Sequence, residues 1–140
     1  MSRYSAGREL EYRIRDLLVA CGFLVVRAAG SKGPADLVAL PRHGVAPEWA
    51  LGRPVLVQAK RGGVLGPAEW NKLLSEALSV SATPVMARYT PRRPVEFFRL
   101  DAPKLARGRQ PMTKLDVGSE LSPEPTSSDP CLAGPRPVLP

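Results

Sequence analysis

The stretch GFLVVRAAGSKGPADLVAL, residues 22–40, decides the fold of this chain. Its two short runs of mostly apolar and partly β-branched residues, at 23–27 and 36–40, are typical of strands. Between them, residues 28–35 include two glycines and a proline, which favour a turn. The stretch therefore predicts two strands joined by a turn, and the second strand begins with a charged residue, Asp36.

Helices are predicted before and after this stretch. An apolar stripe with helical spacing predicts a helix over residues 6–21, and Gly22 ends it. The members of this stripe are Leu10, Ile14, Leu17, Leu18 and Cys21. A second apolar stripe, which follows Pro67, predicts a helix over residues 67–80 because proline suits the first turn of a helix.

Three more apolar runs, at residues 55–60, 84–89 and 95–100, predict three further strands. The loop before the first of them, residues 41–54, contains three prolines and two glycines. The resulting order αβββαββ predicts an α/β fold in which helices flank a mixed central sheet.

The charge of the chain points to a polyanionic partner. The 140 residues hold 20 lysines and arginines against 13 acids, a net charge of +7. We expect one folded domain over residues 1–118 and a disordered tail rich in proline and serine over 119–140. Since the tail holds more acids than bases, the folded part carries the positive excess. Such a domain favours nucleic acid, although a merely cationic surface is the alternative.

The sequence predicts no membrane segment. No apolar run approaches the ~20 residues that a membrane-spanning helix needs. Arg3 and Arg8 lead into the first predicted helix and not into the apolar core of a signal peptide. We therefore expect a soluble protein in the cytoplasm.

Four polar residues stand out against the apolar pattern: Glu11, Asp36, Gln58 and Lys60. Alternation along the strand at 55–60 puts Gln58 and Lys60 on the same side. A cation bound by Asp36, Gln58 and the carbonyl of Ala59, with Glu11 completing its shell, would suit phosphodiester hydrolysis. Lys60 could then orient or deprotonate the attacking water.

Each of these residues also has a purely structural interpretation. Glu11 fits a solvated helix position, and Asp36 fits the edge of a turn or strand. Gln58 and Lys60 fit the wet side of an edge strand. The combination favours a site, because an apolar strand seldom carries a lysine that has no partner.

Together, Glu11, the stretch 22–40, Gln58 and Lys60 resemble the archaeal and viral Hjc-type Holliday junction resolvases, which are nucleases of the PD-(D/E)xK type. The resemblance covers roughly residues 3–100. It implies a restriction-endonuclease-like fold, a homodimer, and paired nicking of four-way DNA junctions that depends on Mg²⁺ or Mn²⁺. It also implies a cytoplasmic protein, in the host cytoplasm if a virus encodes it.

The resemblance assigns roles to individual residues. Glu11, Asp36 and Lys60 match the catalytic acids and lysine, and Arg27, Ser31 and Lys32 match a DNA-contacting segment. The chain departs from the pattern twice, since Gln58 replaces the usual glutamate and Tyr12 a common arginine. A neutral amide oxygen at position 58 should bind metal less tightly.

These considerations give the following candidates. The catalytic candidates are Glu11, Asp36, Gln58 and Lys60. The metal-binding candidates are Glu11, Asp36, Gln58 and Ala59. The DNA-binding candidates are Arg3, Arg8, Arg27, Ser31, Lys32, Arg61 and Lys72. The favoured function is a junction-selective endodeoxyribonuclease. The alternatives are a less selective DNA nuclease of the same fold and a catalytically weak DNA-binding module.

A homodimer needs a self-complementary apolar patch. The sequence offers two candidates for it, which are the second helix with Trp70, Leu73 and Leu74 and the late strand with Phe97 and Phe98. The alternative is that these residues only cover the sheet of a single chain.

Overall fold

The computed structural model of this chain describes residues 3–28, 35–104 and 110–117, with side chains from residue 8 onward. The elements in chain order are α1 (Arg3–Ala20), β1 (Phe23–Arg27), β2 (Leu37–Pro41), the 3-10 helix η2 (Glu48–Ala50), β3 (Val55–Arg61), α2 (Pro67–Ser79), β4 (Thr83–Tyr89), β5 (Glu96–Leu100) and β6 (Met112–Leu115). Within these ranges, no helix has the length and apolar character needed to cross a bilayer. The predicted tail, residues 119–140, lies outside the described residues.

The strands form one mixed six-stranded sheet in the order β1-β2-β3-β4-β5-β6. β3 and β4 are parallel and are connected through α2, whereas every other neighbouring pair is antiparallel. This confirms the predicted α/β fold with a mixed central sheet. Two elements were not predicted, η2 and β6. β6 is a four-residue strand at the sheet edge, and so short a run carries little alternation.

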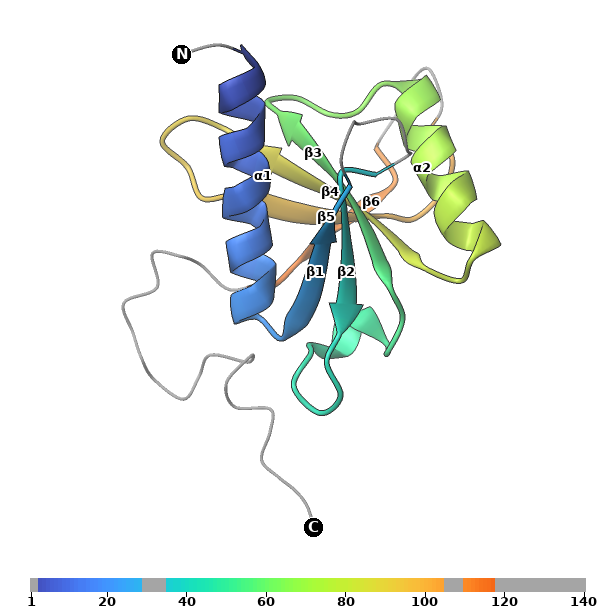
Figure 1. Cartoon of the computed structure of the whole chain (residues 1–140). Helices are drawn as coiled ribbons and strands as arrows, with labels where there is room; N and C mark the ends of the chain where they lie inside the picture. Colours follow the sequence, from blue (N-terminus) through green and yellow to red (C-terminus); the bar gives the residue numbers. More distant parts are fainter. Residues whose placement is uncertain (1–2, 29–34, 105–109, 118–140) are drawn as a thin grey trace.

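The two helices cover opposite sides of the sheet (Figure 1). On one side, Leu10, Ile14 and Leu18 of α1 pack in a core with Val55 and Val57 of β3. On the other side, α2 packs over β3 and β4 with a smaller core. The members of this smaller core include Leu65, Trp70, Leu73, Met86 and Phe98. Each side of the sheet is thus covered by its own helix and has its own hydrophobic core.

Gly22 makes the turn from α1 into β1, as the sequence predicts. Its φ is +105°, a conformation that residues with a side chain rarely adopt. A Cβ atom at this position would lie 2.7 Å from the carbonyl oxygen of Val45. Both the turn and the close approach of the backbone therefore require glycine here.

The predicted dimer interface is wrong. Trp70, Leu73 and Leu74 are buried between α2 and the sheet, and Phe97 and Phe98 are buried in the two cores of the same chain. The indole nitrogen of Trp70 also donates a hydrogen bond of 2.9 Å to the carbonyl of Ala102. These residues hold the single chain together, and none of them is available as a docking patch.

Candidate functional site

Asp36 stands where β1, β2 and β3 meet. Its backbone N–H donates to the carbonyl of Val57 at 2.9 Å, and its carbonyl accepts from Ala28 at 2.8 Å. Its side-chain oxygen Oδ2 accepts two hydrogen bonds, from the N–H of Ala59 at 2.9 Å and from Nε2 of Gln58 at 3.1 Å. The structure therefore brings together two residues that are 22 positions apart in the sequence.

Strand alternation explains why Gln58 and Lys60 accompany Asp36. Val55 and Val57 of β3 point into the α1 core, whereas Leu56 packs against the α2 core. Gln58 and Lys60 follow Leu56 at steps of two and so face the α2 side of the sheet. Both are partly buried. This placement matches the side of the strand that the sequence assigns to them.

The carboxyl group of Asp36 lies in an environment that disfavours its charge. Burial raises its pKa above the ordinary value, and the negative charges of Glu11 and Glu69 raise it further. The hydrogen bond from the N–H of Ala59 acts in the opposite direction but does not outweigh the burial. A half-buried carboxylate near other acids is what a cation would stabilise.

Glu11 acts on this site from the other side of the sheet. Its Oε1 accepts a hydrogen bond of 2.9 Å from Nε of Arg27, with which it forms a partly buried ion pair. The guanidinium of Arg27 also lies 5.2 Å from the centre of the Tyr12 ring. Arg27 is thus held against the acid and the tyrosine that stands where the resolvase pattern commonly has arginine.

The donor groups around Asp36 fit a hard cation. Among the described residues, no three histidine, cysteine or acidic side chains converge closely enough to hold a metal ion. Backbone and amide oxygens would therefore have to join the carboxylate, as they do at Mg²⁺ sites. The carbonyl of Ala59 lies on the same side of β3 as its N–H, which points at Asp36. Gln58 now presents its amide nitrogen, so its oxygen would face a cation once the amide turns over.

The predicted DNA-binding residues differ in their exposure and in whether the structure describes them. Arg61 ends β3 and is exposed, and Lys72 is exposed on α2, one turn after Glu69. Arg8 is exposed on α1. Arg3 begins α1, but its side chain lies outside the described residues, and so do Ser31 and Lys32.

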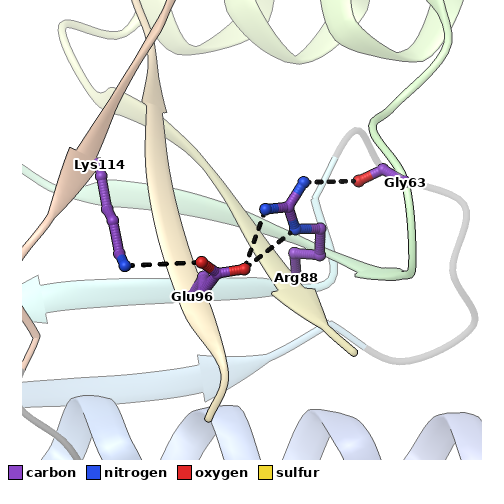
Figure 2. Close-up of polar contacts among 4 residues, drawn as sticks. All are labelled: Gly63, Arg88, Glu96 and Lys114. Carbon is purple, nitrogen blue, oxygen red and sulfur yellow. Dashed lines mark hydrogen bonds and ion pairs between the residues drawn. The ribbon is translucent and has the colours of Figure 1, made fainter. Parts of the chain in front are cut away.

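A polar network on the α2 side of the sheet was missed by the sequence reasoning. Arg88 lies beside Lys60 in the parallel register of β3 and β4. Figure 2 shows its guanidinium bound to Glu96 at 2.9 Å and to the carbonyl of Gly63 at 3.3 Å, while Lys114 lies 3.5 Å from Glu96. Arg88 thereby ties the loop after β3 to β5. Only the pairing of the strands reveals this network, because its members come from β4, β5, β6 and the loop after β3.

Glu69 was also missed. It lies in the first turn of α2, where an acid commonly interacts with the helix dipole, and nothing in the sequence distinguishes it from that ordinary role. Its charge nevertheless reaches Asp36.

Comparison with solved structures identifies the fold that carries this site. No protein-family model matches the chain, and neither does any curated protein. Among solved structures it is similar to Hjc, a Holliday junction resolvase from the archaeal hyperthermophile Archaeoglobus fulgidus. The match has a TM-score of 0.53 and 23% identity, and it covers 65% of this chain and 73% of the other. The chain has the fold of a Holliday junction resolvase. This confirms the resolvase-type, restriction-endonuclease-like fold that the sequence predicts.

Proposed function

We propose that this protein is a metal-dependent endodeoxyribonuclease that resolves four-way DNA junctions by paired nicking. The observation that carries the proposal is the meeting of Asp36, Gln58 and the Ala59 backbone just before the start of β2, with Lys60 on the same side of β3 as Gln58. Within a resolvase fold, this is an oxygen-rich site beside a cationic side chain.

The metal in this proposal is Mg²⁺, with Mn²⁺ as a substitute. Asp36, the carbonyl of Ala59 and the amide oxygen of Gln58 would hold it, and Glu11 would add its charge from α1. When bound, such a cation stabilises charge on the phosphoryl oxygens and lowers the pKa of a bound water.

The side chains of the chain itself supply the remaining chemistry. Lys60 would orient the attacking water and stabilise negative charge that develops at phosphorus. Arg27 holds Glu11 in place through their ion pair, and the charge of Glu11 acts on Asp36. Arg88 fixes the loop that follows Lys60 through its bond to the carbonyl of Gly63.

The proposed substrate is branched DNA. The chain carries a net charge of +7, and a cationic surface attracts the phosphate backbone through the release of condensed counterions. The basic candidates contact backbone, which positions a protein on DNA without reading its sequence. A homodimer belongs to the proposal, because two cuts related by the two-fold symmetry of the junction need two sites.

The test compares cleavage of a synthetic four-way junction with cleavage of a linear duplex of equal length, each with Mg²⁺ and with EDTA. The proposal predicts symmetric nicks in the junction only, and only with metal. Degradation of both substrates would favour the less selective nuclease. Junction binding without any cleavage would favour the DNA-binding module.

A pair of variants connects this activity to the site. Lys60→Ala should reduce cleavage at least ~100-fold with little change in junction affinity, which is the usual effect of removing one group that acts in the transition state. Lys114→Ala removes the same charge from the far edge of the sheet and serves as the control. Equal activity of the two variants would contradict the role of Lys60.

A further inference from the structure

The candidate site offers little negative charge to a cation. Gln58 contributes only a neutral amide. Glu11 is charged, but its carboxylate is already paired with Arg27 at 2.9 Å. Asp36 is then the one acid of the set predicted from sequence that forms no ion pair with a described residue. Mg²⁺ is usually held by one or two carboxylates together with water, so the site has room for a second acid.

Glu69 lies in the first turn of α2, and the packing of that helix places it near Asp36. The next residue, Trp70, is fully buried and belongs to the same hydrophobic core as Ala35. Ala35 directly precedes Asp36 in the chain. The α2 core thus joins the first turn of α2 to the segment that carries Asp36. In agreement with this placement, the negative charge of Glu69 acts on Asp36 and helps to raise its pKa.

The side chain of Glu69 has no local partner. It is the third residue of α2, where a glutamate can accept a hydrogen bond from the N–H of the capping residue, here Gly66. Glu69 does not make this bond, and its carboxylate forms no ion pair or hydrogen bond with any described residue. The side chain is also exposed. The fold therefore fixes the backbone of Glu69 beside the site and leaves its carboxylate available to a cation.

We propose that Glu69 supplies the negative charge that the amide of Gln58 cannot provide and holds the Mg²⁺ of the candidate site from the α2 side. The inference rests on the proposed function and names a further residue for its metal. Mg²⁺ keeps several of its waters when it binds to a protein, so an acid can hold the ion through these waters as well as directly. A contact through water agrees with the finding that no three histidine, cysteine or acidic side chains converge within the described residues.

Metal binding in the absence of DNA tests the role of Glu69. Bound Mg²⁺ stabilises the folded chain, so a Mg²⁺ titration followed by thermal melting gives the half-saturating concentration. Electron paramagnetic resonance of free Mn²⁺ gives the affinity for the second metal. Glu69→Gln should raise both half-saturating concentrations roughly 10-fold, a usual effect of removing a residue that supports a metal ligand. If Glu69 only interacted with the helix dipole, the variant would change the melting temperature equally in EDTA and in Mg²⁺.

Glu76→Gln is the matched control. Glu76 is exposed on the same helix, about two turns after Glu69, so the variant removes an equal charge from α2 outside its first turn. Its half-saturating Mg²⁺ and Mn²⁺ concentrations should equal those of the wild type. The melting curves in EDTA verify that both variants are folded.

Gln58→Glu tests whether Glu69 provides the charge that residue 58 lacks, because this variant gives the site a second carboxylate of its own. In the Gln58→Glu background, Glu69→Gln should raise the half-saturating concentration by a smaller factor than it does in the wild type. An equal factor in both backgrounds would overturn the proposal, since the charge of Glu69 would then act independently of residue 58.

The outcomes separate the role of Glu69 from the proposed function. A wild-type protein that is not stabilised by metal and does not cut the junction would contradict the proposed function. A wild type that binds metal and cuts the junction, together with wild-type metal affinity of folded Glu69→Gln, would overturn the role of Glu69 alone. Equal losses of affinity in Glu69→Gln and Glu76→Gln would also overturn it, because they would reflect the net charge of α2 and not a contact at the site.

Discussion

Asp36 occupies a position that disfavours its ionised form. Burial and the charges of Glu11 and Glu69 all raise its pKa, so the folded chain holds a proton on this group more readily than the unfolded chain does. Ionised Asp36 therefore reduces stability at neutral pH. The charge of Asp36 thus lowers the stability of the free protein. A bound cation would compensate this charge, which is why we place the proposed cation at Asp36.

The first prediction concerns Asp36→Asn. A single oxygen, Oδ2, accepts both hydrogen bonds from Gln58 and Ala59, and the amide oxygen of asparagine can accept the same two. The variant should therefore abolish cleavage, leave junction binding intact or tighter, and melt at an equal or higher temperature than the wild type in EDTA. Electrophoretic junction binding, cleavage and thermal melting measure the three effects.

The difference in melting temperature between Asp36→Asn and the wild type should depend on pH. Below the ordinary pKa of aspartate, Asp36 is protonated in both the folded and the unfolded chain, and the variant should gain nothing. As the pH rises through the raised pKa, the wild type becomes less stable relative to Asp36→Asn. A variant that melts well below the wild type at pH 7 would show that the charge of Asp36 stabilises the metal-free fold.

The second prediction concerns Gln58→Glu. The amide nitrogen of Gln58 lies 3.1 Å from Asp36, so a glutamate here would bring two carboxylates together. Without metal the variant should be less stable than the wild type. With Mg²⁺ it should reach half-maximal cleavage at a lower metal concentration, because the site gains a charged ligand. An unchanged metal requirement would show that residue 58 does not touch the cation.

At the residue scale, the sequence predicts which side chains are unusual better than it predicts their partners. Alternation along β3 correctly puts Gln58 and Lys60 on one side, because a strand has a fixed period. The ion pair between Glu11 and Arg27 depends on how α1 packs over β1, and local pattern contains no information on that packing.

At the scale of elements, the α2 side of the sheet is held together by charge as well as by apolar packing. Arg88 in β4 binds Glu96 in β5, and Lys114 in β6 lies beside the same carboxylate (Figure 2). The guanidinium of Arg88 also lies 4.8 Å from the centre of the Phe98 ring. The pKa of Glu96 is raised by partial burial but lowered more strongly by Arg88 and Lys114, so it lies below the ordinary value. This carboxylate therefore stabilises the fold when ionised.

The third prediction follows from the lowered pKa of Glu96. Glu96→Gln should lower the melting temperature at pH 7 by roughly 4 °C, the effect of about 1 kcal/mol in a domain of this size. The stabilisation by Glu96 is present above the ordinary glutamate pKa and is lost as the pH falls through the lowered value in the folded chain. The wild type and the variant should therefore converge in acid.

Glu76→Gln provides the control for this prediction. Glu76 is exposed on α2, so the variant should leave the melting temperature nearly unchanged at both pH values. A constant difference between wild type and Glu96→Gln from pH 7 down to acid would contradict the role of the charge.

The strands differ in how well the sequence predicts them. β1, β2 and β3 are bounded by glycine or proline and are rich in apolar residues, so their predicted bounds lie within one residue of the observed ones. β6 has only four residues, of which Thr113 and Lys114 are exposed, and it gains its structure from pairing with β5. Pairing partners are supplied by the fold, and for that reason an edge strand of this kind is missed.

At the scale of the whole molecule, a dimer of this chain needs a surface other than the one first predicted. β1 and β2 form the end of the sheet that α2 does not cover. The register pairs Leu24 with Leu40 and Val26 with Val38, so these four side chains form one apolar group on the α2 side. Leu24, Val26 and Leu40 are exposed. This group lies on β1 and β2, and β2 begins directly after Asp36 of the candidate site.

The charge of the chain favours this surface for a second copy. Two chains of net charge +7 repel each other, so an uncharged patch is where they can approach most closely. A two-fold axis brings the same patch of each copy together. For the proposed homodimer we therefore expect the four apolar residues of β1 and β2 to face their counterparts, with the two active sites on either side of the axis.

The last prediction tests this interface with Val26→Asp and Val80→Asp. The two valines are similarly exposed, at 52% and 60%, but Val80 caps the end of α2 and does not belong to the group on β1 and β2. Sedimentation without DNA should show a dimer for the wild type and for Val80→Asp, and a monomer for Val26→Asp, because a buried pair of like charges opposes association. Val26→Asp should also nick a cruciform plasmid without linearising it. A Val26→Asp protein that remains dimeric would place the interface elsewhere, whereas a monomeric wild type that still makes paired cuts would contradict the dimer itself.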